Sequence, residues 1–446
     1  MGISDTRIAF VTLGCAKNEV DTDKMRARLA AASFSFTSDE DAADIVIVNT
    51  CAFLEAAVEE AIEVILDIAE RQEQREHPAR ILVAGCLPSR YGEQLQDELD
   101  EVACFVAVQD EDGIVDACLD LLGPDAAAHE RPAGAPAALR EEAGPSAYVK
   151  ISDGCDTCCS YCMIPQIRGR YHSFAAEAIE REVAQLVEVG TREVVLIAQD
   201  TGIWGRDLPG APTTASLLEL LATRFADTWF RLMYVQPSGV TDELLSCMAA
   251  HDNVCSYLDI PLQHVSARLL SRMNRSGSAE EFLALVARIR AAVPGVTLRT
   301  TFMAGFPGET PEDVEELLAF IDDAEFDYAG VFPYSREEGS AAACFDGQVD
   351  EDEKIARAQR VLDACEAVGC ARARLHIGRE ADVLVEGYEC TDVGLEALCR
   401  SQAMAPDVDG QIHVPISHES ELAIGTLTRV RIVDSFFHEL EGERIV

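Results

Sequence analysis

The sequence predicts an α/β protein made of an N-terminal doubly wound parallel sheet, a central partial (β/α)6 barrel and a small C-terminal all-β barrel. Short apolar runs alternate with helical stretches at the start of the chain and again in its middle, which is the pattern of parallel sheets covered by helices. The helical pattern stops after Gly378. We therefore expect domains at 5–122, 147–378 and 379–446, with an Ala-, Pro- and Gly-rich linker at 123–146.

The N-terminal third contains four short apolar runs of the kind that form buried parallel strands. They lie at residues 7–13, 45–48, 81–84 and 105–108. Long periodic segments between them, such as residues 55–75, predict helices. The expected fold of this third is an open, doubly wound sheet.

Three cysteines follow strands of this predicted sheet: Cys15, Cys51 and Cys86. Ligands of open parallel sheets bind at the carboxyl ends of the strands, so three sulfurs would meet at one edge. The alternative is that cysteine is simply a common buried residue. Simple burial explains a cysteine at any one of these positions, but it explains poorly why cysteines occur at all three equivalent strand ends. We therefore favour a cluster-binding site.

The central and C-terminal parts of the chain also contain predicted strands. Six apolar strands are predicted in the centre, at 148–152, 193–198, 231–235, 257–260, 297–304 and 328–332, and four in the last part, at 380–386, 398–403, 411–415 and 427–434. The chemistry of a (β/α) barrel lies on the loops after its strands. After the fifth central strand, Thr310 and Pro311 predict the cap and first residue of a helix.

The loop after the first central strand carries Cys155, Cys159 and Cys162 at C-x3-C-x2-C spacing. Cysteine ligation of a cubane iron–sulfur cluster is usually four-fold, so three thiolates leave one iron open to a ligand. Cys158 adds a fourth sulfur, and zinc is the alternative metal. Two directly adjacent C-x-x-C pairs are too close for the usual zinc knuckle geometry, which disfavours zinc.

Composition limits the location and partners of the chain. No apolar run reaches the roughly 18 residues of a membrane span, and the N-terminus does not resemble a signal peptide. We therefore expect a cytoplasmic protein whose 16 cysteines serve metal binding or catalysis rather than disulfides. The net charge of −43 disfavours direct RNA binding and favours basic protein partners, although general acidity for solubility explains it equally well.

The chain resembles the methylthiotransferase family of radical S-adenosylmethionine (SAM) enzymes over about residues 7–440. The C-x3-C-x2-C loop is the signature of that superfamily, and the three spread cysteines and the small terminal barrel, similar to a TRAM domain, complete the likeness. Further motifs that carry it are the runs at 13–18, 49–51, 84–86, 162–165, 168–169, 199–201, 259–264, 299–302, 305–310 and 404–407.

The resemblance implies two 4Fe-4S clusters and SAM as cofactors. Cys155, Cys159 and Cys162 would hold the cluster that reduces one SAM to start radical chemistry, and Cys15, Cys51 and Cys86 would hold a second cluster that carries sulfur. A further SAM would supply the methyl group. The motifs are most similar to the branch that adds a methylthio group to the β-carbon of an aspartate in a small-subunit ribosomal protein.

The resemblance also implies residues that contact SAM, and each has a structural alternative. Tyr161 would stack near the adenine of SAM, or it would be an aromatic residue of the core. Arg299 would form an ion pair with a carboxylate of SAM or of the substrate, or it would neutralise a neighbouring acidic residue of the protein. The glycines of the loop after the fifth strand would contact SAM or form a tight turn. The full expected set is Tyr161, Gln199, Asp200, Asp259, Gln263, Arg299, Gly305 and Gly308.

Two other functions remain open on the sequence. The sister branch of the family modifies an adenosine of transfer RNA, but residues 379–446 carry 5 basic against 14 acidic residues and fit RNA phosphate poorly. A non-catalytic iron–sulfur carrier or scaffold would need clusters but no SAM site. For the enzyme, we expect a basic ribosomal protein as substrate and an electron donor such as a flavodoxin or ferredoxin.

Overall fold

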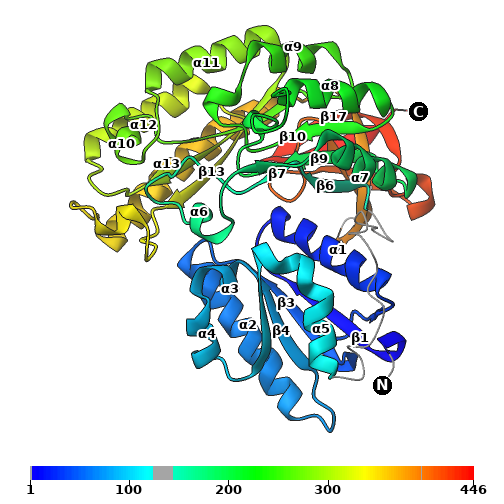
Figure 1. Cartoon of the computed structure of the whole chain (residues 1–446). Helices are drawn as coiled ribbons and strands as arrows, with labels where there is room; N and C mark the ends of the chain where they lie inside the picture. The colour runs from blue at the N-terminus through cyan, green and yellow to red at the C-terminus, as the bar shows by residue number, and fades with distance from the viewer. Residues whose placement is uncertain (1–2, 124–143, 393, 446) are drawn as a thin grey trace.

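The computed structural model describes residues 3–123, 144–392 and 394–445. Figure 1 shows the N-terminal domain (blue to cyan) below the central domain (green to yellow), with the C-terminal barrel (orange to red) against the back of the central domain. Nearly all of the predicted linker lies outside the described residues. In the part of the chain that is described, no helix is both long and apolar enough to span a membrane.

The N-terminal domain is a five-stranded parallel sheet in the order β2-β1-β3-β4-β5, which confirms the predicted doubly wound class. Alternate residues of β3 face opposite sides: Ile45 and Ile47 pack with α1 and α5, and Val46 and Val48 pack with α2 and α3. The elements are β1 (Arg7–Thr12), α1 (Ala16–Ala31), β2 (Ser35–Phe36), β3 (Ile45–Thr50), α2 (Glu55–Glu73), β4 (Arg80–Gly85), α3 (Cys86–Tyr91), α4 (Glu93–Glu98), β5 (Val102–Ala107) and α5 (Ile114–Leu122).

The central domain has the six expected parallel strands, which form two three-stranded sheets, β6-β9-β10 and β11-β12-β13. The sheets meet through a bridge between Phe230 and Val254. The strands are β6 (Ser146–Lys150), β9 (Glu193–Ile197), β10 (Trp229–Leu232), β11 (Tyr257–Gln263), β12 (Thr297–Ala304) and β13 (Tyr328–Pro333). A short ribbon, β7 (Ser152–Asp153) with β8 (His172–Ser173), borders the cysteine loop.

Helices cover the outer face of this partial barrel (Figure 1). They are α7 (Ala176–Glu188), α8 (Thr214–Arg224), α9 (Asp242–Ala250), α10 (Ala267–Arg272), α11 (Ala279–Ala292), α12 (Pro311–Ala324) and α13 (Glu351–Arg374). The short α6 (Ile164–Ile167) instead packs against α3 of the N-terminal domain. The predicted start of α12 is confirmed: Thr310 is its N-cap in a capping box with Asp313, and Pro311 is its first residue.

The C-terminal domain is a closed barrel in the order β14-β15-β16-β18-β17. Its strands are β14 (Glu380–Thr391), β15 (Gly394–Ser401), β16 (Ile412–Ile416), β17 (Leu427–Phe436) and β18 (Glu439–Arg444). Four strands were expected, and β18 was missed because its sequence is mostly charged. Only Leu440 of this strand joins the apolar core of the barrel.

Buried ion pairs attach the barrel to the central domain. Glu193 of β9 accepts hydrogen bonds from Arg231 of β10, at 2.7 Å, and from Arg400 of β15. Burial alone would raise the pKa of Glu193, but the two guanidinium groups lower it to about 2. An apolar cluster continues this joint and takes residues from all three domains, including Val20, Tyr257 and Leu384. The three domains therefore share one packed junction.

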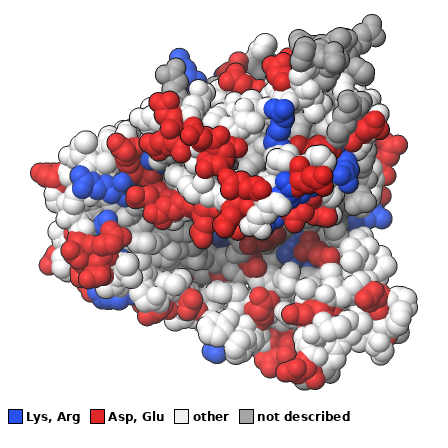
Figure 2. Space-filling view, turned by 90° about the horizontal axis from the view of Figure 1, so that it is seen from below, with Lys and Arg blue, Asp and Glu red and all other residues white. Residues whose placement is uncertain are grey.

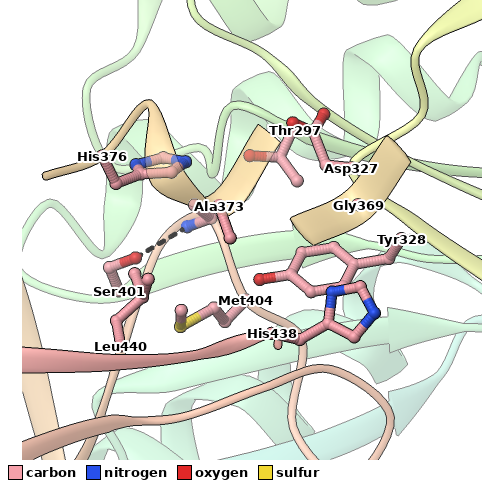
Figure 3. A pocket seen from close by; sticks show the side chains of 11 residues that line it. Thr297, Asp327, Tyr328, Gly369, Ala373, His376, Ser401, Met404, His438 and Leu440 are labelled. Atoms are coloured by element: carbon pink, nitrogen blue, oxygen red, sulfur yellow. Dashed lines mark hydrogen bonds between the residues drawn. The ribbon is translucent and has the colours of Figure 1, made fainter. Parts of the chain in front are cut away.

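A cavity of about 20 Å³ lies where α13 and β13 meet the barrel (Figure 3). It has room for one water molecule, and the Nδ1 atom of His438 in its wall has no hydrogen-bond partner among the described residues. Ser401 closes one side, where its Oγ accepts from the backbone N–H of Ala403 at 3.2 Å. None of the six expected cluster cysteines lines this cavity, so it belongs to the joint between domains.

Candidate active site

The first three cysteines lie at the carboxyl ends of adjacent strands. Cys15 follows β1 and is the N-cap of α1, Cys51 follows β3, and Cys86 is the first residue of α3 directly after β4. Since β1, β3 and β4 are neighbours in the sheet, the three residues occupy one edge. This is the edge at which open parallel sheets bind ligands.

Local packing fixes the loops that carry these cysteines. Gly14 has φ +105°, and a Cβ at this position would lie 2.5 Å from the Cβ of Cys51. Asn18 and Asn49 tie the loops together: Asn18 Nδ2 donates to the Thr50 carbonyl at 2.8 Å, and Asn49 Nδ2 donates to the Asn18 carbonyl at 2.9 Å. Glycine is therefore required for the close approach of the first two cysteine loops.

The second three cysteines lie in the loop after β7. Two of their sulfurs accept backbone N–H groups, Cys155 Sγ from Thr157 at 3.4 Å and Cys162 Sγ from Ile164 at 3.5 Å. A guanidinium group, Nη1 of Arg275, lies 3.9 Å from Cys159 Sγ. Hydrogen bonds to the sulfurs are a normal feature of iron–sulfur ligation and help to set cluster potential.

The geometry of this loop does not fit zinc. Tetrahedral Zn–S bonds hold sulfurs about 3.8 Å apart. In the described part of the chain, one group of three possible ligands has all its ligand atoms within 4.8 Å of one another, and it consists of Glu219, Cys247 and His251. No three sulfurs of the cysteine loop therefore lie that close together. Cys158 itself is exposed, with a left-handed backbone at φ 51°. Three spread thiols with N–H and guanidinium donors instead fit a cubane cluster.

Arg168 joins the two domains beside the first three cysteines. Its side chain is buried and forms ion pairs with Asp21 of α1 at 3.0 Å and with Asp153 at 3.2 Å. Its Nη2 atom also lies 3.7 Å from Cys86 Sγ. Lys150 binds the same two carboxylates. The sequence does not reveal the partner Asp21, because it belongs to another domain and lies far away along the chain.

Burial governs the ionisation of the cysteine thiols. It raises the pKa of both Cys86 and Cys162 to about 12, and it also raises the pKa of Cys51. The charge of Arg168 opposes this effect at Cys86, and that of Arg275 opposes it at Cys162. Bare thiols in these positions hold their protons, whereas metal binding requires and stabilises the thiolate.

Gln199 and Asp200 follow β9 and differ in whether their polar atoms have hydrogen-bond partners. Both polar atoms of the Gln199 amide are buried without a hydrogen-bond partner among the described residues. An unsatisfied buried amide is costly and indicates a ligand that completes it. Asp200 accepts from the backbone N–H groups of Gly202 at 3.1 Å and Gln236 at 3.4 Å, and burial raises its pKa to about 6.

Asp259 and Arg299 lie side by side on β11 and β12. Arg299 Nη1 donates to Asp259 Oδ1 at 3.2 Å, and its Nε lies 3.4 Å from Asp409 Oδ1 of the C-terminal domain. The other oxygen of Asp259 accepts from the backbone N–H of Tyr234 at 3.1 Å. Arg299 therefore balances two acids, and Asp409 and Tyr234 are site residues that sequence reasoning missed.

The remaining expected SAM contacts make interactions within the protein. Tyr161 packs against the main apolar core, and Gln263 ends β11 with a left-handed backbone at φ 72°. The Gly305 N–H donates to both carboxylate oxygens of Glu309, each at 2.9 Å, and the Gly308 N–H donates to the Gly347 carbonyl at 2.7 Å. The Gly305 contact is that of a tight turn, whereas the Gly308 contact joins the loop to a distant segment of the chain, and a role of these residues in SAM binding stays a prediction.

Three family matches divide the chain in the same way as its fold. The family described as Uncharacterized protein family UPF0004 matches residues 7–107, the Radical SAM superfamily matches residues 149–321, and the TRAM domain matches residues 377–445.

Several curated proteins are similar to the chain over its whole length. Three with the name Ribosomal protein uS12 methylthiotransferase RimO come from Geobacter sulfurreducens (41% identical, covering 100% of both chains), Pelotomaculum thermopropionicum (40%, 100% of both) and Desulforudis audaxviator (42%, 98% of this chain and 96% of the other).

Solved structures support the fold alone. The radical SAM methyltransferase TsrM from Kitasatospora setae matches with a TM-score of 0.55 at 17% identity, over 75% of each chain. The cobalamin-dependent radical enzyme OxsB matches with a TM-score of 0.51 at 13% identity, over 79% of this chain and 56% of the other.

Proposed function

This chain belongs to the RimO family of ribosomal protein uS12 methylthiotransferases, which are radical SAM enzymes, and we propose that it adds a methylthio group to the β-carbon of an aspartate of uS12. The observation that carries this proposal is the pairing of two incomplete cysteine sets, one on each side of the domain interface that Arg168 crosses. Each set offers three thiols, one fewer than the usual complement of a cubane.

The cysteines divide the cofactor binding between the domains. Cys155, Cys159 and Cys162 hold one 4Fe-4S cluster in the central domain, and Cys15, Cys51 and Cys86 hold another in the N-terminal domain. When bound, the clusters and SAM supply the electron, the radical and the sulfur and methyl groups that side chains cannot provide. The protein contributes the thiolates and the hydrogen bonds to them.

The strand-end polar groups are proposed to bind SAM. Among the described residues, the two buried atoms of the Gln199 amide have no partner, and the Asp200 carboxylate beside it accepts hydrogen bonds from backbone N–H groups alone. Gln199 and Asp200 would contact the amino group or ribose of SAM. Tyr161, Asp259, Gln263, Arg299, Gly305 and Gly308 complete the proposed binding set.

Charge supports a basic protein as the substrate. The chain has a net charge of −43, and Figure 2 shows Asp and Glu spread over the face seen from below with fewer Lys and Arg among them. Such a field attracts a Lys- and Arg-rich ribosomal protein and repels RNA phosphate. The electrons are proposed to come from a flavodoxin or ferredoxin in the cytoplasm.

The decisive experiment gives the anaerobically reconstituted protein SAM, sulfide and a reductant together with purified uS12, or with bulk transfer RNA. We expect the mass of one methylthio group to appear on an aspartate of uS12. The control is the Cys155→Ala/Cys159→Ala/Cys162→Ala variant, which should form neither deoxyadenosine nor product. Modified RNA with unmodified uS12 would overturn the proposed substrate in favour of the transfer RNA branch.

A further inference from the structure

We propose that Lys17 binds the carboxylate of the substrate aspartate in the space between the two cysteine sets. This inference rests on the proposed function and names the residue that selects aspartate at that site.

Lys17 reaches across the domain interface. It is the second residue of α1, two positions after Cys15, and its Nζ lies 3.6 Å from the centre of the Tyr234 ring. Tyr234 follows β10 in the central domain. The ammonium group of the N-terminal domain is therefore seated on an aromatic ring of the SAM-binding domain, beside the residue expected to ligate the second cluster.

Lys17 forms no salt bridge with a carboxylate of the described residues. No carboxylate oxygen lies within 4.0 Å of its Nζ there, and the Tyr234 ring offers only a cation–π contact. Burial lowers the pKa of Lys17, and the charges of Cys15, Asp153 and Asp259 oppose this effect, but Asp153 is already paired with Arg168 and Asp259 with Arg299. A carboxylate brought in by the substrate would complete the site with a charge-assisted hydrogen bond.

The backbone of Tyr234 holds its ring in place. Its φ is 62°, a left-handed conformation that is unusual for an aromatic residue. Two hydrogen bonds maintain it: the Tyr234 N–H donates to Asp259 Oδ2 at 3.1 Å, and the Thr201 N–H donates to the Tyr234 carbonyl at 3.1 Å. Backbone strain that the surroundings enforce is typical of functional sites. Here it places the ring under Lys17 and fixes where the ammonium points.

A carboxylate anchor also orients the atom that reacts. The β-carbon of aspartate is one bond from the carboxylate carbon, so holding the carboxylate limits the directions in which the β C–H bonds can point. Orientation of this kind raises the rate of a reaction by removing unproductive arrangements. Asparagine has the same shape but no charge, so it tests the anchor directly.

The experiment measures the affinity of the reconstituted full-length protein for two probes, uS12 and a uS12 variant whose target aspartate is replaced by asparagine. For the wild-type chain we expect the aspartate form to bind about ten-fold tighter, as a charge-assisted contact implies. Lys17→Met should abolish this preference while keeping iron content and SAM-dependent deoxyadenosine formation. Lys17→Arg should restore part of it.

The matched control is Lys24→Met. Lys24 lies two turns further along α1 and also rests on a ring, that of Phe174 at 4.9 Å, but it forms a salt bridge with Glu182 away from the cysteines. This variant should keep the wild-type preference. An unchanged preference in Lys17→Met, with uS12 still modified, would overturn the inference and leave the proposed function intact. Failure of the wild-type chain to bind or modify uS12 would overturn both.

Discussion

Arg168 Nη2 lies 3.7 Å from Cys86 Sγ, although the two residues belong to different domains. The same guanidinium group forms ion pairs with Asp21 and Asp153, both of which are buried. One side chain thus links the edge that carries the first three cysteines to the loop that carries the other three. The position of the cysteine sets relative to each other depends on this contact.

Replacing Arg168 by Met should destabilise the protein by about 3 kcal/mol, because it leaves two buried carboxylates with only Lys150 to neutralise them. Urea denaturation of the metal-free protein measures this free energy of unfolding. Arg170→Met is the matched control: its side chain is 93% exposed and its ion pair with Asp156 is 3.6 Å long. That variant should change stability by less than about 0.5 kcal/mol. Equal effects of the two substitutions would contradict the bridging role of Arg168.

Gly14→Ala should remove the N-terminal cluster without affecting the central one. The new Cβ would lie 2.5 Å from Cys51 Cβ, and the φ of +105° is strained for any other residue. We expect iron content to fall by about half while deoxyadenosine is still formed from SAM. Gly190→Ala has a similar φ of +109° with nothing within 4 Å of the added Cβ. The Gly190→Ala variant should retain all of its iron. A full iron content in Gly14→Ala would show that the added Cβ does not disturb the N-terminal cluster site.

Glu111 should make stability fall as the pH rises. Burial, and then the charge of Asp21, raise its pKa to about 8, and its Oε1 is buried without a partner among the described residues. The unfolded value is about 4.3, so ionisation costs more in the folded state. This cost is absent below about pH 4, grows up to about pH 8 and is then constant.

Glu111→Gln should therefore gain stability relative to the wild-type chain at pH 9 but not at pH 4, by an amount on the order of a few kcal/mol. Urea denaturation midpoints at the two pH values measure this difference. Glu98→Gln, at an exposed position, should behave as the wild type. Parallel stability curves for the wild type and Glu111→Gln would rule out a raised pKa.

Gly369→Ala should loosen the C-terminal barrel. Alanine within a helix is normally about 1 kcal/mol better than glycine, but here its Cβ would lie 2.4 Å from His438 Cε1 and 3.0 Å from the Asp327 carbonyl oxygen. We expect a lower melting temperature instead of a higher one. Removing the ring in Gly369→Ala/His438→Ala should recover part of the loss, and a stabilised single variant would disprove close packing at this joint.

The sequence predicted the parts of the site that follow local rules. Cys15, Cys51 and Cys86 could be assigned to one edge because each follows an apolar strand, and the start of α12 was predicted from its cap. The partners of Arg168 and Arg299 could not be predicted, since Asp21 and Asp409 come from other domains. Strand β18 was missed for a different reason: its pairing in the barrel overrides a charged sequence that has little strand propensity of its own.

The proposed function requires that two separate cysteine sets each hold an incompletely ligated cluster on facing sides of one interface. Iron and sulfide counts on anaerobically reconstituted protein test it most directly. We expect about eight irons in the wild-type chain and about four in either triple Cys→Ala variant, at Cys15, Cys51 and Cys86 or at Cys155, Cys159 and Cys162. Four irons in the wild-type chain, lost with only one of the two sets, would contradict it.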